Sequence, residues 1–220
     1  MKKATLSFSN VNLRASHIHK FRGFIGNFFK NHDLIHNHDL KTGKPIYRYP
    51  LIQFKLIDKT PAIIAITDKA VSIFSEIFMK LDKIIIEDTV IPVFEKDLKV
   101  EEVEFGYSDE IFMYEFASPW IGLNQKNFKK YNEADREEKN EMLKRVITGN
   151  ILSMSKYLDC WLSKDQKIKI DIKLKEIKVN LKGKSMTGFN GIFKTNFLIP
   201  DYLGIGKSVS RGFGAVRRVI

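Results

Sequence analysis

Histidine is concentrated in one short polar segment of this chain. Four of the five histidines lie between residues 19 and 38, where Lys30 precedes His32, His36 and His38, and Tyr47 follows. Imidazole titrates near neutrality, so it can donate or accept a proton at cellular pH. Two imidazoles beside one RNA phosphate could take a proton from a ribose 2′-OH and return one to the departing 5′-oxygen. A lysine or tyrosine could stabilise the charge that builds on that phosphate.

The same segment allows two other interpretations. A polar loop with several histidines can simply be solvated. A metal site is also conceivable, because His32 and His36 are four residues apart with Asp33 and Asp39 nearby. No Cys-x-x-Cys or His-Glu-x-x-His motif supports that site. The RNA interpretation needs no metal, since RNA supplies its own nucleophile.

A second candidate site is the basic, glycine-rich segment near the C-terminus. Glycines let a backbone approach a phosphate closely, and successive N–H groups can form an anion nest. The segment does not fit a P-loop, because Asp201 stands where the first glycine is required, and too little chain follows for a dinucleotide-binding unit. A tight turn without a ligand is the alternative. The candidate RNA-binding residues are Gly204, Gly206, Lys207, Arg211, Gly212, Gly214 and Arg217.

The elements that must position the histidines follow the order β-α-β-β-α-β. Apolar spacing predicts a strand over residues 4–9, a helix over 14–30 and a strand pair over 47–57 and 61–67. A helix over 68–81 and a fourth strand over 83–93 complete the pattern. The first helix should bury Ile18, Phe21, Ile25 and Phe28. This order is the ferredoxin-like one, and we place its end near residue 95.

The second half fits another, less regular unit of the same kind. Strands are expected over 100–116, 167–182 and 188–200, with a long helix over 141–161 that buries Trp161. The apolar phase flips in the 167–182 strand, which predicts a bulge or a turn near Lys175 and Glu176. The fold class is therefore α+β, with tandem ferredoxin-like (RRM-like) domains and antiparallel sheets. The expected domains are residues 1–95, with the histidine loop, and 96–220, with the glycine-rich loop.

Composition points to an anionic partner. The chain has 37 Lys and Arg against 26 Asp and Glu, a formal charge of +11. Its longest apolar runs are strand-sized, well short of the ~20 residues that span a bilayer, so we expect RNA and no membrane. The N-terminus has no apolar stretch typical of a signal peptide. The single cysteine, Cys160, is consistent with a reducing cytoplasm.

Two regions together carry a family resemblance. Gly204–Gly206 and Gly212–Gly214, with a basic spacer between them and Gly188–Phe193 before them, resemble the signature of the CRISPR repeat-RNA endonucleases, the sixth family of Cas proteins. Arg22–Phe28, the histidine loop and Tyr47–Phe54 resemble the N-terminal domain of its archaeal-type b subgroup. The likeness spans nearly the whole chain.

The resemblance implies a protein that cuts precursor CRISPR RNA within each repeat and leaves a 2′,3′-cyclic phosphate and a 5′-OH. It implies no metal and no cofactor. The implied partners are repeat RNA and other Cas proteins, with the chain a monomer or homodimer. A non-catalytic RNA-binding subunit of an effector complex is the alternative, and a generic RNA chaperone would explain the charge but not the glycines. The residues that match the family's active site are His36, His38, Lys30 and Tyr47, with His32 as a substitute for one histidine.

Overall fold

The protein is described here by a computed structural model that covers residues 1–29, 48–181 and 183–219. The chain forms two compact units. The first contains residues 1–103 together with 209–212, and the second contains residues 104–208 and the chain after residue 212. A short piece of the glycine-rich segment therefore belongs to the first unit, while its flanks belong to the second.

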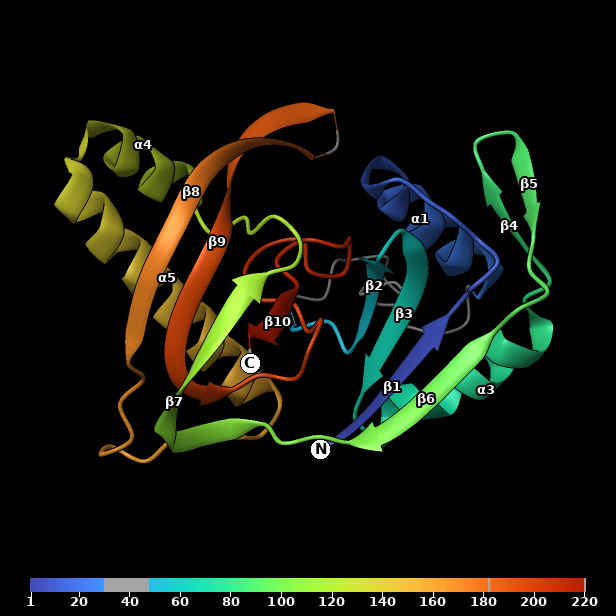
Figure 1. Ribbon diagram of the computed structural model, residues 1–220, viewed down its shortest axis with the longest axis horizontal. Coiled ribbons are helices and arrows are strands. Elements are labelled where there is room, and N and C mark those ends of the chain that lie inside the picture. Colours follow the sequence, from blue (N-terminus) through green and yellow to red (C-terminus); the bar gives the residue numbers. More distant parts are fainter. Residues whose placement is uncertain (30–47, 182, 220) are drawn as a thin grey trace, which may run out of the picture. The chain divides into compact units, whose positions relative to one another are not determined.

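Within the described residues, the first unit is a four-stranded antiparallel sheet with two α-helices. Its strands are β1 (Lys2–Ser7), β2 (Ile52–Ile57), β3 (Thr60–Ile66) and β6 (Asp97–Glu102), in the order β2-β3-β1-β6. A short 3₁₀ turn, η1 (Ala15–His17), leads into α1 (Ile18–Phe28), and α3 (Asp68–Lys80) follows β3 (Figure 1). This is the ferredoxin-like arrangement.

The segment expected to be the fourth strand is instead a separate hairpin. Strands β4 (Lys83–Ile86) and β5 (Thr89–Pro92) form a two-stranded sheet of their own among the described strands, and Glu87 turns the chain between them with φ 56°. The strand that completes the sheet is β6, which pairs with β1. The expected division at residue 95 lies before β6, whereas β6 belongs to the first unit.

Both helices pack on one face of this sheet. The ring of Phe21 on α1 lies edge-on to Phe8 and Phe54, with centroids 5.7 and 5.5 Å apart. All three rings are fully buried, and edge-to-face contacts of this kind add to the gain from burying their surface. The prediction that Phe28 is buried is wrong, because 45% of it is exposed, and the next residue, Phe29, is buried instead.

The second unit repeats the strand order of the first. Its strands are β7 (Gly106–Phe116), β8 (Ile170–Leu181), β9 (Lys184–Leu198) and β10 (Val216–Val219), in the order β10-β7-β9-β8. Helices α4 (Gln125–Glu133) and α5 (Arg136–Tyr157) lie between β7 and β8 in the chain. Between β9 and β10, where a ferredoxin-like unit has its second helix, this unit has the glycine-rich segment. The tandem ferredoxin-like prediction is confirmed.

Two details of the second unit differ from expectation. The pairing of β8 with β9 runs in one unbroken register from Ile170–Thr195 to Leu181–Lys184, so the predicted bulge or turn is wrong. The apolar phase flips because opposite faces of the long hairpin are partly buried at its two ends. Trp161 lies beyond α5 and is 67% exposed, so its predicted burial is also wrong. Over the described residues, no helix is both long and apolar enough to span a bilayer.

Candidate nucleic-acid interface

All four residues predicted to be catalytic lie outside the described part of the chain. Lys30, His36, His38 and Tyr47 fall in residues 30–47, as do His32, Asp33 and Asp39 of the metal interpretation. The described part of the chain before this gap ends at Phe29, after α1, and the part after it begins at Arg48, before β2. The segment that holds these residues is therefore joined to α1 and β2.

Those two elements and a piece of the glycine-rich segment contribute three cations to the first unit. Arg22 comes from α1, Lys55 from β2, and Arg211 from the glycine-rich segment. Arg211 forms a parallel bridge with Phe54, next to Lys55. Burial lowers the pKa of the Arg22 guanidinium, and the charge of Arg211 lowers it further. Two guanidinium groups that repel each other are stabilised by an anion between them. We call Arg22, Lys55 and Arg211 the cation cluster.

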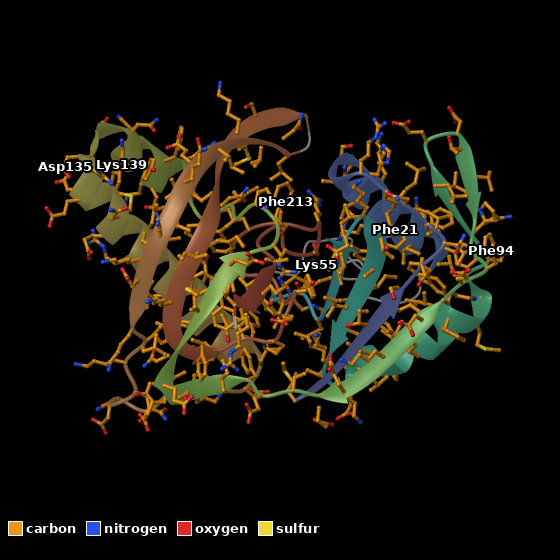
Figure 2. The ribbon with its side chains drawn as sticks, in the orientation of Figure 1. Phe21, Lys55, Phe94, Asp135, Lys139 and Phe213 are labelled. Carbon is orange, nitrogen blue, oxygen red and sulfur yellow. The ribbon has the colours of Figure 1, made fainter. Side chains whose placement is uncertain are left out.

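Lys55, which is labelled in Figure 2, is buried, with 1% of its surface exposed. It lies within a strand whose only other polar residue is Gln53, and its Nζ donates a hydrogen bond of 3.1 Å to the carbonyl oxygen of Val209. Loss of hydration disfavours the charged ammonium, and this lowers the pKa of Lys55 to about 7. The lysine thus ties the piece of chain that carries Arg211 to the first sheet.

The neighbouring polar groups on β2 form a second set of hydrogen bonds. Gln53 is two residues from Lys55, so both side chains leave the sheet on the face opposite Phe54. The Gln53 Nε2 donates to the hydroxyl of Tyr49 at 2.9 Å and to the carbonyl of Pro50 at 3.1 Å. Burial raises the pKa of Tyr49 above its ordinary value. These bonds fix the chain just after residue 47, where the predicted catalytic segment ends.

In the second unit, close packing explains the glycines. Gly206 has φ 89°, and a Cβ there would lie 2.5 Å from Nε1 of Trp120 and 2.9 Å from the carbonyl oxygen of Ile121. A Cβ at Gly214 would lie 2.1 Å from the carbonyl oxygen of Ile205. Two backbone bonds hold the turn: Ile205 N donates to Gly214 O, and Gly214 N donates to Pro119 O. These contacts require glycine whether or not a ligand approaches.

The predicted RNA-binding residues are divided between the two units. Gly204, Gly206, Lys207, Gly214 and Arg217 belong to the second unit, whereas Arg211 and Gly212 belong to the first. A Cβ at Gly212 would lie 2.9 Å from Cγ2 of Ile18 on α1, so this glycine also has a packing role.

The cations of this set differ in their availability. Lys207 donates from its Nζ to the carbonyl of Leu123 at 2.9 Å, and burial lowers its pKa. Arg217 is paired with Glu115, since its Nε lies 2.7 Å from Oε1 of that carboxylate. This pairing raises the pKa of Arg217 and neutralises its charge locally. Of the three predicted cations, Arg211 is therefore the best candidate to bind a phosphate.

Sequence reasoning missed Arg22, Gln53 and Lys55. The sequence did contain one indication that Gln53 and Lys55 have a special role. A lysine and a glutamine at alternate positions of a short apolar strand must either face solvent or be covered by another part of the chain. The segment that covers Lys55 lies 154 residues away, and no local pattern indicates such a partner.

Comparisons with known proteins agree along the whole chain. Residues 1–104 match the family model of the Cas6b N-terminal domain, and residues 106–219 match that of the Cas6b C-terminal domain. The uncharacterized protein MJ0978 of Methanocaldococcus jannaschii is 43% identical over 145 residues, which cover 66% of this chain and 97% of that protein.

Two solved structures are similar over nearly their full length. One, described as a crystal structure of Cas6b, is 38% identical with a TM-score of 0.93 and covers 99% of both chains. The other, described as the CRISPR RNA processing endoribonuclease Cas6b, is 36% identical with a TM-score of 0.80 and covers 100% of both chains.

Proposed function

Because this chain belongs to the Cas6b family, we propose that it is an endoribonuclease that cuts precursor CRISPR RNA within each repeat. The observation that carries the proposal is the match to a Cas6b structure over 99% of both chains. That likeness covers both units, and the second solved relative is described as an RNA processing endoribonuclease. The net charge of +11 suits a polyanionic substrate.

The chemistry we propose uses the RNA's own 2′-OH and no metal. One of His36 and His38 removes the 2′-OH proton, and the 2′-oxygen forms a bond to the adjacent phosphorus. The bond from phosphorus to the 5′-oxygen breaks, and the other histidine gives that oxygen its proton. Lys30 and Tyr47 stabilise the charge on the phosphate. The products are a 2′,3′-cyclic phosphate and a 5′-OH.

The cation cluster supplies electrostatic support on the elements that flank the catalytic segment. Arg22 and Arg211 attract the RNA backbone, and arginine's planar fork suits a phosphate. Lys55 acts through position, because its bond to Val209 holds the chain that carries Arg211. Gly206, Gly212 and Gly214 allow the tight path of that chain, so RNA binding by the glycine-rich segment depends on its internal packing. The setting we propose is the cytoplasm, with other Cas proteins as further partners and the chain a monomer or homodimer.

The direct test compares two repeat RNAs that differ at one atom. The first is all ribose, and the second carries a 2′-deoxy nucleotide at the cut site. The proposal predicts that both bind equally and that only the first is cut. Equal cutting of both would show that the 2′-OH is not the nucleophile. Binding of both without any cutting would favour the non-catalytic RNA-binding subunit.

A further inference from the structure

The second unit contains a polar pocket that the proposed cleavage chemistry does not use. Its volume is about 590 Å³, within the range of pockets that hold small ligands. It lies between α4, the middle of α5 and the Gly206–Lys207 turn. Every residue that lines it belongs to the second unit, so the pocket is complete within that unit.

The pocket offers hydrogen-bond donors in excess of acceptors. The Oδ1 of Asn150 accepts the indole N–H of the buried Trp120 at 3.1 Å. The Oδ1 of Asn124 accepts the backbone N–H of Asn127 at 2.7 Å and so caps α4. With both amide oxygens engaged, the amide NH₂ groups of Asn124 and Asn150 remain to donate to a ligand.

Three cations add to this donor set. Lys130 and Arg145 line the pocket from α4 and α5, and Lys207 lines it from the glycine-rich turn, where its Nζ is held by the carbonyl of Leu123. None of the described residues that line the pocket carries a carboxylate. Among the described residues, none of the three cations forms an ion pair, and the first turn of α4 carries no acidic residue. A helix N-terminus adds partial positive charge to such a site.

A second hollow of about 310 Å³ shares part of its lining with this pocket. Lys130 and Arg145 line both hollows, and Glu133 and Glu138 line only the second. The carboxylate of Glu138 accepts the backbone N–H of Asp135 in the capping box of α5, so it is already engaged. Two hollows that share these cations suit a ligand that extends along both, as a strand does.

We propose that this pocket binds one nucleotide of an RNA strand, with its phosphate between Lys130, Arg145 and Lys207. The excess of donors selects a ligand rich in acceptors, and the volume exceeds what a bare phosphate needs. The amide groups of Asn124 and Asn150 meet the sugar or base edge. A free nucleotide offers the same phosphate, sugar and base groups. We assign the ligand to RNA because a second hollow shares the two cations and because the chain has a net charge of +11. That assignment rests on the proposed function, whereas the phosphate site itself does not.

A matched pair of double variants of the full-length protein tests the site. Lys130→Ala with Arg145→Ala removes two cations that line the pocket. Lys129→Ala with Arg136→Ala removes the same residue types from the same two helices at exposed positions outside it. The probe is a labelled single-stranded repeat RNA with a 2′-deoxy cut site, and affinity is measured by fluorescence anisotropy at several salt concentrations.

The proposal predicts that the pocket variant binds this RNA about tenfold more weakly and that its salt slope falls by about 1. The control variant should stay within about threefold of the parent. Equal losses in both variants would reduce the effect to overall charge and overturn the site, as would unchanged affinity in the pocket variant. Binding is read without cleavage, so a failure of the proposed enzymatic function does not decide this test.

A calorimetric titration with AMP separates the two sources of phosphate. Weak AMP binding that the RNA displaces supports a site for one nucleotide of a strand. Tight AMP binding that persists when the protein is saturated with RNA would assign the pocket to a free nucleotide and overturn the proposal.

Discussion

The Nζ of Lys55 on β2 lies 3.1 Å from the carbonyl oxygen of Val209, across 154 residues of sequence. This bond fastens the central piece of the glycine-rich segment to the first ferredoxin-like unit, to which residues 209–212 belong. The parallel bridge between Phe54 and Arg211 lies directly beside it. The position of Arg211 on the first unit therefore depends on a buried lysine.

Replacing Lys55 with Met should weaken RNA binding, because the apolar stem is kept while the hydrogen bond to Val209 is lost.

The Lys55→Met change should also alter how the stability of the protein depends on pH. The pKa of Lys55 is about 7 in the folded protein and 10.5 in the ordinary group, so the unfolded chain binds more protons between these values. The free energy of unfolding of the parent should therefore rise, relative to Lys55→Met, from pH about 7 to about 10.5. Chemical denaturation across this range measures it, and a constant difference would contradict the account.

Gly206→Ala should destabilise the second unit by roughly 2–4 kcal/mol, because it combines a positive φ with a clash against Trp120 and Ile121. Gly149→Ala is the matched control. Gly149 lies within α5 and a Cβ there would meet nothing within 4 Å, so this change should stabilise the protein by up to about 1 kcal/mol. Thermal unfolding of both variants tests the prediction, which fails if the two midpoints move together.

Arg211→Ala and Arg217→Ala remove the same charge from nearby positions in the sequence. Arg217 is already neutralised by Glu115, whereas Arg211 lies beside Arg22. We expect Arg211→Ala to weaken RNA binding about tenfold and to lower the salt slope by about 1, with a smaller effect for Arg217→Ala. Filter binding at several salt concentrations compares them, and the reverse order would show that the cation cluster is not part of the RNA surface.

His36→Ala and His38→Ala should each lower the single-turnover rate roughly 100-fold or more, since each removes a group that transfers a proton. RNA affinity should change little, because a neutral imidazole adds little to phosphate binding. His19→Ala is the control, because His19 lies exposed on α1. Parental rates in both the His36 and the His38 variant would transfer the chemistry to His32 or support the non-catalytic alternative.

The fold was predictable from the sequence where the apolar pattern marks the buried strands and helices. The strand order follows from buried stretches such as β3, whose residues are almost all buried. The pattern failed at β6, because this edge strand is exposed and charged, whereas the apolar β4 looked like the missing strand. Edge strands are commonly charged to prevent aggregation, and this hides them from a hydrophobicity argument.

The candidate site was only partly predictable for a different reason. The glycines that need positive φ or close approach, such as Gly206 and Gly214, mark the segment in the sequence. The structure explains these glycines by close packing, of Gly206 against Trp120 and of Gly214 against Ile205. The three residues of the cation cluster come from three distant parts of the chain. No spacing within the sequence indicates that Arg22 lies near Arg211 or that Lys55 binds the carbonyl of Val209.

The most direct test of the central claim is the chemical identity of the product ends. A repeat RNA is incubated with the protein in excess EDTA, and the fragments are analysed by mass spectrometry. The account predicts full cleavage at one position, with a 2′,3′-cyclic phosphate on the upstream fragment and a 5′-OH on the downstream one. Cleavage that requires added divalent metal, or that leaves a 3′-OH and a 5′-phosphate, would contradict it.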